Sequence, residues 1–191
     1  MKRIIVAITG ASGAAYGIRA LELLREAGVE THLVLSPSAG RTISAETDRT
    51  IEDVRSIASV VHPFKDIGAS IASGSFRTDG MLVAPCSVKT LSAIAHCAAE
   101  ELVARAADVQ LKERRRVVLL FRETPLHAGH IALMERATLN GAVVMPPVPA
   151  FYHRPCTIAD LVDQTVGRAL DLFGIDSPAV HRWSGRPPED D

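Results

Sequence analysis

Five short, mostly hydrophobic runs recur along the chain, each followed within two residues by a glycine, serine, proline or charged residue. They span residues 4–8, 31–35, 80–85, 117–121 and 142–145. Short apolar runs of this kind are typical of strands that are buried on both faces. Apolar residues at helical spacing separate them, at residues 14–28, 38–47, 51–59, 100–116 and 158–173. The pattern predicts an α/β fold, with helices on both faces of a parallel sheet.

Length and composition narrow the classes of function. The 191 residues suit one domain, expected at residues 1–183, with a disordered acidic tail at 184–191. Because 47% of the residues are hydrophobic and the mean hydropathy is +0.16, we expect part of the surface to be buried in an oligomer. A net charge of −1 and an aromatic content of 4% argue against a nucleic-acid partner.

Membrane and cysteine signals favour a cytoplasmic protein. No stretch of the sequence approaches the roughly 18 apolar residues of a membrane span. Cys86, Cys97 and Cys156 are odd in number and far apart, without a CxxC pair. That spacing argues against a disulfide framework and a zinc site, and it fits a reducing compartment.

The first strand runs directly into the sequence Thr-Gly-Ala-Ser-Gly, residues 9–13, and then into alanine-rich helical sequence. Free backbone N–H groups and the helix dipole both favour an anion at such a turn. The stretch therefore predicts a site for a nucleotide or a phosphate. The alternative is that Gly10 and Gly13 only permit a tight turn.

The ends of three later strands carry further candidate chemistry. Ser36 stands where folds that bind NAD usually place an acidic residue, which argues against NAD. Ser87 opens a helix as a natural N-cap, and its hydroxyl also suits a phosphate. Arg122 and Glu123 directly follow a buried strand, where charges cost desolvation energy unless they are used or paired. Ligands of parallel sheets bind beyond such strand ends.

Segments outside the strands gave weaker signals. Residues 66–77, rich in glycine and serine, are predicted to form a mobile loop near the site. Helical spacing predicts the surface ion pairs Glu101–Arg105 and Asp108–Lys112. The proline-rich residues 146–155 predict a rigid, extended segment that holds aromatic pocket walls. His127 and His130 are interpreted as helix surface, because no third metal ligand lies nearby.

Three longer motifs, LVARAADVQLKERR, RETPLHAGH and PPVPAFYHRP, complete the set of strand-end residues. Together they closely resemble the flavin prenyltransferases of the UbiX/Pad type, over about residues 2–176. The resemblance implies a flavodoxin-like (Rossmann-like) fold and a homododecamer with FMN at subunit interfaces. It also implies an enzyme that joins the dimethylallyl group of dimethylallyl monophosphate to N5 and C6 of reduced FMN without a metal. The prenylated FMN then passes to a (de)carboxylase of the UbiD type.

The resemblance also assigns site residues. Those expected to hold FMN are Gly10, Ala11, Ser12, Ser36, Ser87, Val88, Lys89, Thr90 and Arg122. Those expected around the prenyl phosphate are Lys112, Glu123, Tyr152 and Arg168, with Arg105 in support. Ser12 and Glu46 are expected near the reactive edge of the flavin, and Trp183 is expected to help close the pocket. The catalytic set is therefore Ser12, Glu46, Lys112 and Glu123.

The chemistry explains these residue types. An allylic phosphate leaves only when its charge is neutralised, and without Mg²⁺ the positive charges must come from lysine and arginine. Glu123 can give a proton to the leaving group. Tyr152 offers a π surface beside the allylic cation.

Other classes of protein share parts of this pattern. Short-chain NADP-dependent reductases also open with Thr-Gly-Ala-Ser-Gly, but they carry a Tyr-x-x-x-Lys dyad. Here Tyr16 is followed at that spacing by Ala20, and Tyr152 by Cys156. A flavin-dependent decarboxylase of cysteine substrates and a non-catalytic flavin carrier remain alternatives. The RETP and AFYHRP segments favour the transferase over both.

Overall fold

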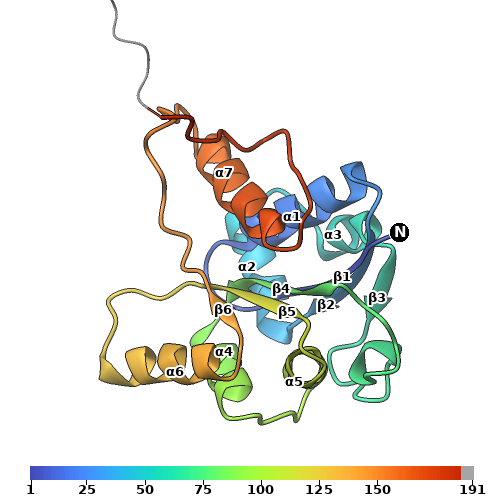
Figure 1. Cartoon of the computed structure of the whole chain (residues 1–191). Coiled ribbons are helices and arrows are strands. Elements are labelled where there is room, and N and C mark those ends of the chain that lie inside the picture. Colours follow the sequence, from blue (N-terminus) through green and yellow to red (C-terminus); the bar gives the residue numbers. More distant parts are fainter. Residues whose placement is uncertain (186–191) are drawn as a thin grey trace, which may run out of the picture.

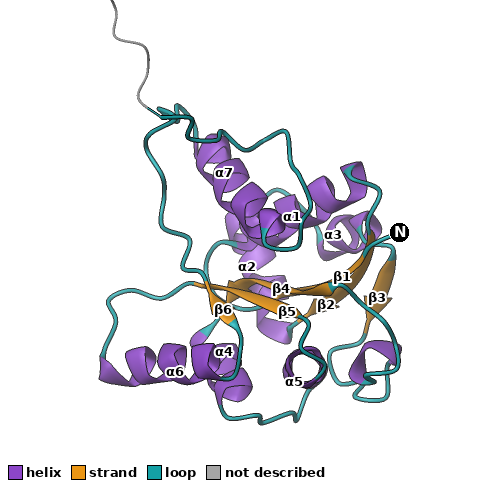
Figure 2. Ribbon diagram, viewed as in Figure 1, coloured by secondary structure: helices purple, strands orange, loops and turns teal. Residues whose placement is uncertain are grey.

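The computed structural model describes residues 1–185 and contains a six-stranded, fully parallel sheet in the order β3-β2-β1-β4-β5-β6 (Figure 2). The strands are β1 (Arg3–Ile8), β2 (Glu30–Leu35), β3 (Val60–His62), β4 (Gly80–Cys86), β5 (Arg116–Phe121) and β6 (Val143–Val144). The chain winds outward from β1 in one direction and from β4 in the other. This order reverses between β1 and β4, which is the point where such sheets bind ligands.

All five strands expected from the sequence are present, and the α/β prediction is confirmed. The sixth strand, β3, was not predicted. It has three residues at the edge of the sheet, and Val60 and Val61 are 37% and 40% exposed. A run this short, directly after a helix, carries no strand signal of its own, and pairing with β2 decides its conformation.

Helices cover both faces of the sheet (Figure 1). On one face lie α1 (Ala14–Glu26), α2 (Pro37–Glu46), α3 (Ile51–Ile57) and α7 (Ile158–Asp171). On the other lie α4 (Val88–Ala95), α5 (Leu102–Lys112), α6 (Ala128–Leu139) and the 3₁₀ turn η1 (Ser70–Ala72). Alternate residues of β1 serve the two cores: Ile4 packs against the first group, and Ile5 against the second. The continuous apolar run of β1 follows from burial on both sides.

Several local predictions need correction. Residues 66–77 are not irregular throughout: the 3₁₀ turn η1 lies within them, and its Ile71 is 1% exposed and packs in the same core as α5. Helix α5 ends at Lys112 rather than at residue 116, because Arg114 takes a left-handed conformation with φ of 56° and β5 then begins. The predicted ion pairs on this helix are also wrong. Arg105 contacts Asp108 at 3.1 Å, and Lys112 contacts Glu113 at 2.5 Å.

Glu101 caps the start of α5 instead of pairing with Arg105. Its carboxylate caps α5 by accepting hydrogen bonds from the N–H groups of Val103 and Ala104, at 2.7 and 3.1 Å. A carboxylate that satisfies two otherwise unpaired N–H groups gains more than an exposed pair with Arg105 would offer.

The expected tail, residues 184–191, lies mostly outside the described residues, and the extent of the domain at 1–183 stays a prediction. Within residues 1–185, no helix combines the length and the apolar character needed to cross a membrane. Helix α6 buries only Ala137, while Ile131 and Leu139 are 56% and 79% exposed. A large apolar surface is therefore open on this helix.

Candidate active site

The turn between β1 and α1 is fixed by close packing. Thr9, 1% exposed, donates its hydroxyl to the carbonyl of Pro85 at 2.7 Å and accepts from the N–H of Ser87 at 2.9 Å. Gly10 has no room for a side chain, since an added Cβ would lie 2.3 Å from the Cβ of Ser38. Gly13 has a φ of 103°, which glycine adopts without strain. These contacts set the turn against the starts of α2 and α4.

The first N–H groups of α1 already hold an anion. The carboxylate of Glu46 accepts hydrogen bonds from the backbone N–H groups of Gly13 and Ala14, at 2.7 and 3.1 Å. Burial opposes the ionisation of Glu46, but these bonds, a bond from the Ser12 hydroxyl and the charge of Arg122 together lower its pKa. Glu46 therefore carries a negative charge beside Ser12 at neutral pH. It also occupies part of the place where the sequence predicted a phosphate.

Two other helix N-termini face the turn. Ser36 caps α2 by accepting from the N–H of Ala39 at 3.2 Å. Ser87 caps α4 by accepting from the N–H of Thr90 at 3.3 Å, and the hydroxyls of Ser87 and Thr90 lie 3.1 Å apart. Pro37 follows Ser36 at the first helical position, where its missing N–H costs nothing. Serine side chains thus cap both helices at the carboxyl edge of the sheet.

These helix starts border a groove of about 940 Å³. Its polar lining includes Ser36, Ser87, Lys89 and Thr90, and Phe64 gives it an apolar wall. Gly10 and Glu101 also line it. The volume is of the size that holds a cofactor. The groove combines hydroxyl donors and two lysines, Lys65 and Lys89, with apolar surface, a combination that suits a phosphate joined to a flat ring.

Arg122 and Glu123 follow β5 at the same edge of the sheet. The N–H of Arg122 donates to the carbonyl of Cys86 at 3.1 Å, which holds this segment beside the end of β4. Burial raises the pKa of Tyr16, while the charge of Arg122 acts in the opposite direction. Arg122 is nevertheless exposed and Glu123 half-buried, so the argument from desolvation does not apply to Arg122. The carboxylate of Glu123 accepts from the N–H of Thr124 at 3.0 Å.

The remaining expected site residues lie elsewhere on the chain. Lys112 ends α5 near Gly74, and Arg105 on the same helix donates to the carbonyl of Ala72 at 3.3 Å. Arg168, in the last turn of α7, contacts Asp171 at 2.5 Å. None of these residues lines the 940 Å³ groove. One copy of the chain therefore does not bring these three residues to the lining of the groove.

Tyr152 and Trp183 form a third group. Their rings meet edge to face with centroids 5.8 Å apart, and they are 46% and 61% exposed. The hydroxyl of Tyr152 donates to the carbonyl of His181 at 2.8 Å. This group lies beside the first half of α7, through the contact of Gln164 with the Tyr152 hydroxyl at 2.7 Å.

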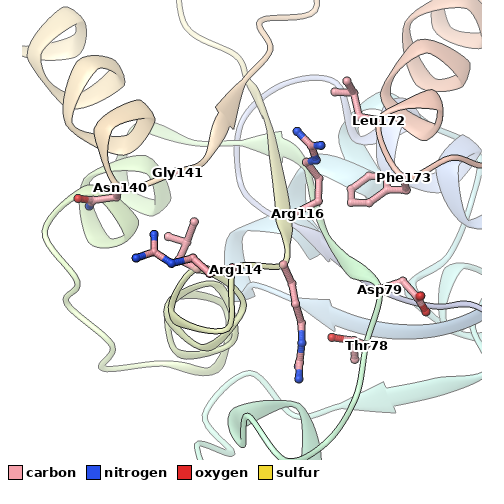
Figure 3. A pocket seen from close by; sticks show the side chains of 10 residues that line it. Thr78, Asp79, Arg114, Arg116, Asn140, Gly141, Leu172 and Phe173 are labelled. Atoms are coloured by element: carbon pink, nitrogen blue, oxygen red, sulfur yellow. The ribbon is translucent and has the colours of Figure 1, made fainter.

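A second hollow, of about 500 Å³, lies where the strands begin, between Thr78 and Phe173 (Figure 3). Arg114 and Arg116 border it but point in different directions. Arg115 is committed to the carbonyls of Phe76 and Gly74, at 2.9 and 2.7 Å. The charges around this hollow do not converge on one point. The hollow also lies at the edge of the sheet opposite to the strand ends that bind ligands.

Comparison with known proteins decides between the classes of function. The family model named Flavoprotein matches residues 1–169. The flavin prenyltransferase UbiX of Thauera aromatica is 58% identical over 96% of this chain and 94% of its own length. AnUbiX (PadA1), solved in complex with FMN and dimethylallyl pyrophosphate, has a TM-score of 0.96 and 53% identity, covering 97% of this chain and 99% of its own. A dodecameric FMN-dependent UbiX-like decarboxylase from Escherichia coli O157:H7 has a TM-score of 0.93 and 48% identity, covering 96% and 100%.

The chain belongs to the UbiX family of flavoproteins. The resemblance noted in the three long motifs is therefore confirmed, as is the flavodoxin-like fold. For a UbiX family member, the residues that the sequence assigned to FMN divide in two. Gly10, Ser36, Ser87, Lys89 and Thr90 line the groove, whereas the other four do not. Of these four, Val88 lines a separate hollow beside His127 and His130, and Ala11, Ser12 and Arg122 line neither.

Sequence reasoning missed three residues of this UbiX family site. Thr9 joins the glycine turn to Ser87, Phe64 forms the apolar wall of the groove, and Gln164 holds Tyr152. A buried threonine between an apolar strand and a glycine is a usable signal for Thr9. Phe64 and Gln164 have no local signal, because each acts on residues from distant parts of the chain. Among residues 1–185, no three His, Cys, Asp or Glu side chains gather into a possible metal site.

Proposed function

We propose that this chain is a flavin prenyltransferase that joins the dimethylallyl group of dimethylallyl monophosphate to N5 and C6 of reduced FMN. The observation that carries the proposal is the groove of hydroxyl groups and apolar surface at the carboxyl edge of the sheet. It lies in a chain 53% identical, over nearly its whole length, to a UbiX protein solved with FMN and dimethylallyl pyrophosphate. That ligand carries the same allylic group with one more phosphate, so the donor experiment compares both esters.

The residues of the groove fit FMN. The hydroxyls of Ser36, Ser87 and Thr90 and the ammonium of Lys89 suit its phosphate and ribityl oxygens. Phe64 supplies apolar surface for the ring. Because Glu46 occupies N–H groups of α1, the phosphate is directed to the starts of α2 and α4. Gly10, Ala11 and Arg122 complete the proposed flavin contacts at the turn.

The proposed chemistry needs charges that one copy of the chain holds in different places. When bound, reduced FMN supplies the atoms that accept the prenyl group. Lys112, Arg105 and Arg168 neutralise the donor phosphate, so that no metal ion is required. Glu123 donates a proton to the phosphate oxygen that leaves. The ionised Glu46, bonded to the Ser12 hydroxyl, accepts a proton released at the flavin in this proposal, which its lowered pKa supports.

The proposed site is completed between copies of the chain. Lys112 on α5 and Arg168 on α7 do not line the groove, so a site that uses both must draw on more than one copy. The apolar surface left open on α6 supports assembly. We expect a homododecamer, in line with the dodecameric relative. The free cysteines Cys86, Cys97 and Cys156 support a cytoplasmic enzyme that passes prenylated FMN to a UbiD-type decarboxylase.

An anaerobic single-turnover experiment tests the proposal. The protein is loaded with FMN, reduced and mixed with dimethylallyl monophosphate or the diphosphate, with and without EDTA. Mass spectrometry should find FMN with one added dimethylallyl unit, in equal yield with the chelator. Reduced FMN without protein and oxidised FMN with protein are the controls. Recovery of unmodified FMN alone, while a known flavin prenyltransferase reacts in parallel, would refute the assignment and favour a flavin carrier.

A further inference from the structure

The side chain of Gln164 is the polar centre of the C-terminal part of the chain. It lies on α7, is 3% exposed, and reaches two separate segments. Its Nε2 donates to the hydroxyl of Tyr152 at 2.7 Å and to the carbonyl of His181 at 3.1 Å. Its Oε1 accepts from the N–H of His181 at 2.9 Å. Three of the four hydrogen bonds that an amide can make are therefore in place.

These bonds fix the Tyr152 hydroxyl in one orientation. It accepts from Gln164 and donates to the carbonyl of His181, so its proton points toward the backbone. The same bonds hold residue 181, and Trp183 lies two residues further along, edge to face with the Tyr152 ring. The imidazole of His153 stacks on His181 at 5.3 Å, but its ring nitrogens have no hydrogen-bond partner within residues 1–185. Two sets of polar contacts therefore anchor this segment to α7: Gln164 holds residue 181, and Arg182 donates two bonds to Asp171 at the end of the helix, each 2.9 Å long. Of the two, only Gln164 also bonds the Tyr152 hydroxyl.

We infer that Gln164 is a positioning residue: it ties the segment of residues 181–183 to α7 and thereby places Tyr152 and Trp183 for the prenyl donor. The inference rests on the proposed function only for the role of the donor. For the Tyr152 hydroxyl to donate to a phosphate, it must release the His181 carbonyl. The Gln164 amide keeps that carbonyl paired when this happens, because its own bond to the carbonyl remains. Gln164 therefore lets Tyr152 change partner while the His181 carbonyl keeps a hydrogen bond within the chain.

Substitution of Gln164 tests the role, and the chain offers a matched control. Gln164→Met keeps the length of the side chain and removes all three bonds, and Gln164→Glu keeps the shape but replaces the N–H donors with an acceptor. Gln110 is equally buried, at 1% exposed, and accepts from Thr78 at 2.7 Å far from this segment. Gln110→Met therefore removes a buried glutamine bond at a purely structural place.

The first measurement needs no donor. Trp183 is the single tryptophan of the chain, so its emission reports on this segment alone. In FMN-free protein, both Gln164 variants should show lower Trp183 anisotropy and faster acrylamide quenching, while Gln110→Met should match the wild type. Unchanged anisotropy in Gln164→Met would overturn the inference. Failure of prenyl transfer by the wild type would leave this result intact, so the two proposals fail separately.

The second measurement compares donor and flavin. In single turnover, we expect Gln164→Met to raise the half-saturating concentration of dimethylallyl monophosphate by about 10-fold, equivalent to ~1.4 kcal/mol. The Kd for FMN should stay within about twofold, because Gln164 does not line the groove. If Gln164→Met folds poorly, Gln164→Glu gives the same comparison. Equal losses of FMN and donor binding, or an equal loss in Gln110→Met, would assign Gln164 to stability alone.

Discussion

Replacing Arg168 with alanine separates donor binding from folding. The Arg168 guanidinium contacts the carboxylate of Asp171 at 2.5 Å, and its side chain is 51% exposed. Asp171 also accepts two bonds from Arg182, each 2.9 Å long. Arg182 thus keeps Asp171 paired when Arg168 is removed. Since exposed ion pairs contribute roughly 0–1 kcal/mol, we expect the free energy of unfolding to fall by less than about 1 kcal/mol.

The expected loss in donor efficiency is much larger. A charge-assisted hydrogen bond to a phosphate is worth about 1.5–3 kcal/mol. Its removal therefore lowers the single-turnover efficiency with dimethylallyl monophosphate by roughly 10- to 150-fold. The affinity for FMN should hardly change, because Arg168 stands in the last turn of α7 and does not line the groove.

Arg55→Ala is the matched control for Arg168→Ala. Arg55 pairs with Glu52 at the same i,i+3 spacing, and its side chain is likewise 51% exposed. The assay follows adduct formation against donor concentration, with flavin titration and urea unfolding of each variant. Arg55→Ala should leave transfer unchanged. Parallel losses of FMN and donor binding in Arg168→Ala, in step with the melting temperature, would show that Arg168 has only a structural role.

Three further predictions concern assembly, catalysis and acid stability. In oligomers reassembled from equal amounts of the impaired Ser12→Ala and Lys112→Ala chains, about one quarter of the sites should have both intact residues if the site is shared by two copies. Activity no higher than that of the separate variants would mean that one copy supplies both. Ser12→Ala alone should bind FMN and transfer slowly, since it loses the hydroxyl that bonds Glu46, and wild-type turnover would exclude a catalytic role. Hydrogen bonds from Arg3 and His32 lower the pKa of Glu30 from 4.5 to about 2. This depressed pKa gives stability that is present above pH 4.5 and is lost as the pH falls toward about 2. Urea unfolding at a series of pH values should therefore show that the free energy of unfolding of Arg3→Met falls less steeply over this range than that of the wild type. An unchanged slope would contradict the assignment.

The strands and most helices could be predicted because their signals are local. The run of β1 and the cap Ser87 report burial and a helix start within a few residues. β3 failed this test, since only pairing with β2 makes it a strand. The prediction of the ion pairs on α5 was wrong for a different reason. Glu101 caps the helix instead of pairing with Arg105, and residue spacing alone does not show which of these two interactions is more stable.

The candidate site was predictable in its residue types and not in its arrangement. Serines and glycines at strand ends identified the groove, because parallel strands bring their carboxyl ends to one edge. That the carboxylate of Glu46 would fill the start of α1 had no signal in the sequence, since α2 alone carries it to the turn. The separation of Lys112 and Arg168 from the groove was equally hidden, because their motifs give identity and not position.

The placement of charge explains why this fold needs assembly for its proposed chemistry. Lys112 and Arg168 have side chains that are 49% and 51% exposed, and water screens such charges. At 4 Å, an ion pair in water is worth about 1 kcal/mol, against about 4 kcal/mol at the effective dielectric near a covered protein surface. Exposed cations on one copy therefore do little for a leaving phosphate. The same cations would interact more strongly with the phosphate if a second copy covered them. Burial of the exposed apolar residues Ile131 and Leu139 would favour the binding of a second copy. In the proposed function, assembly is therefore expected to remove water from the two charges that take the place of a metal ion.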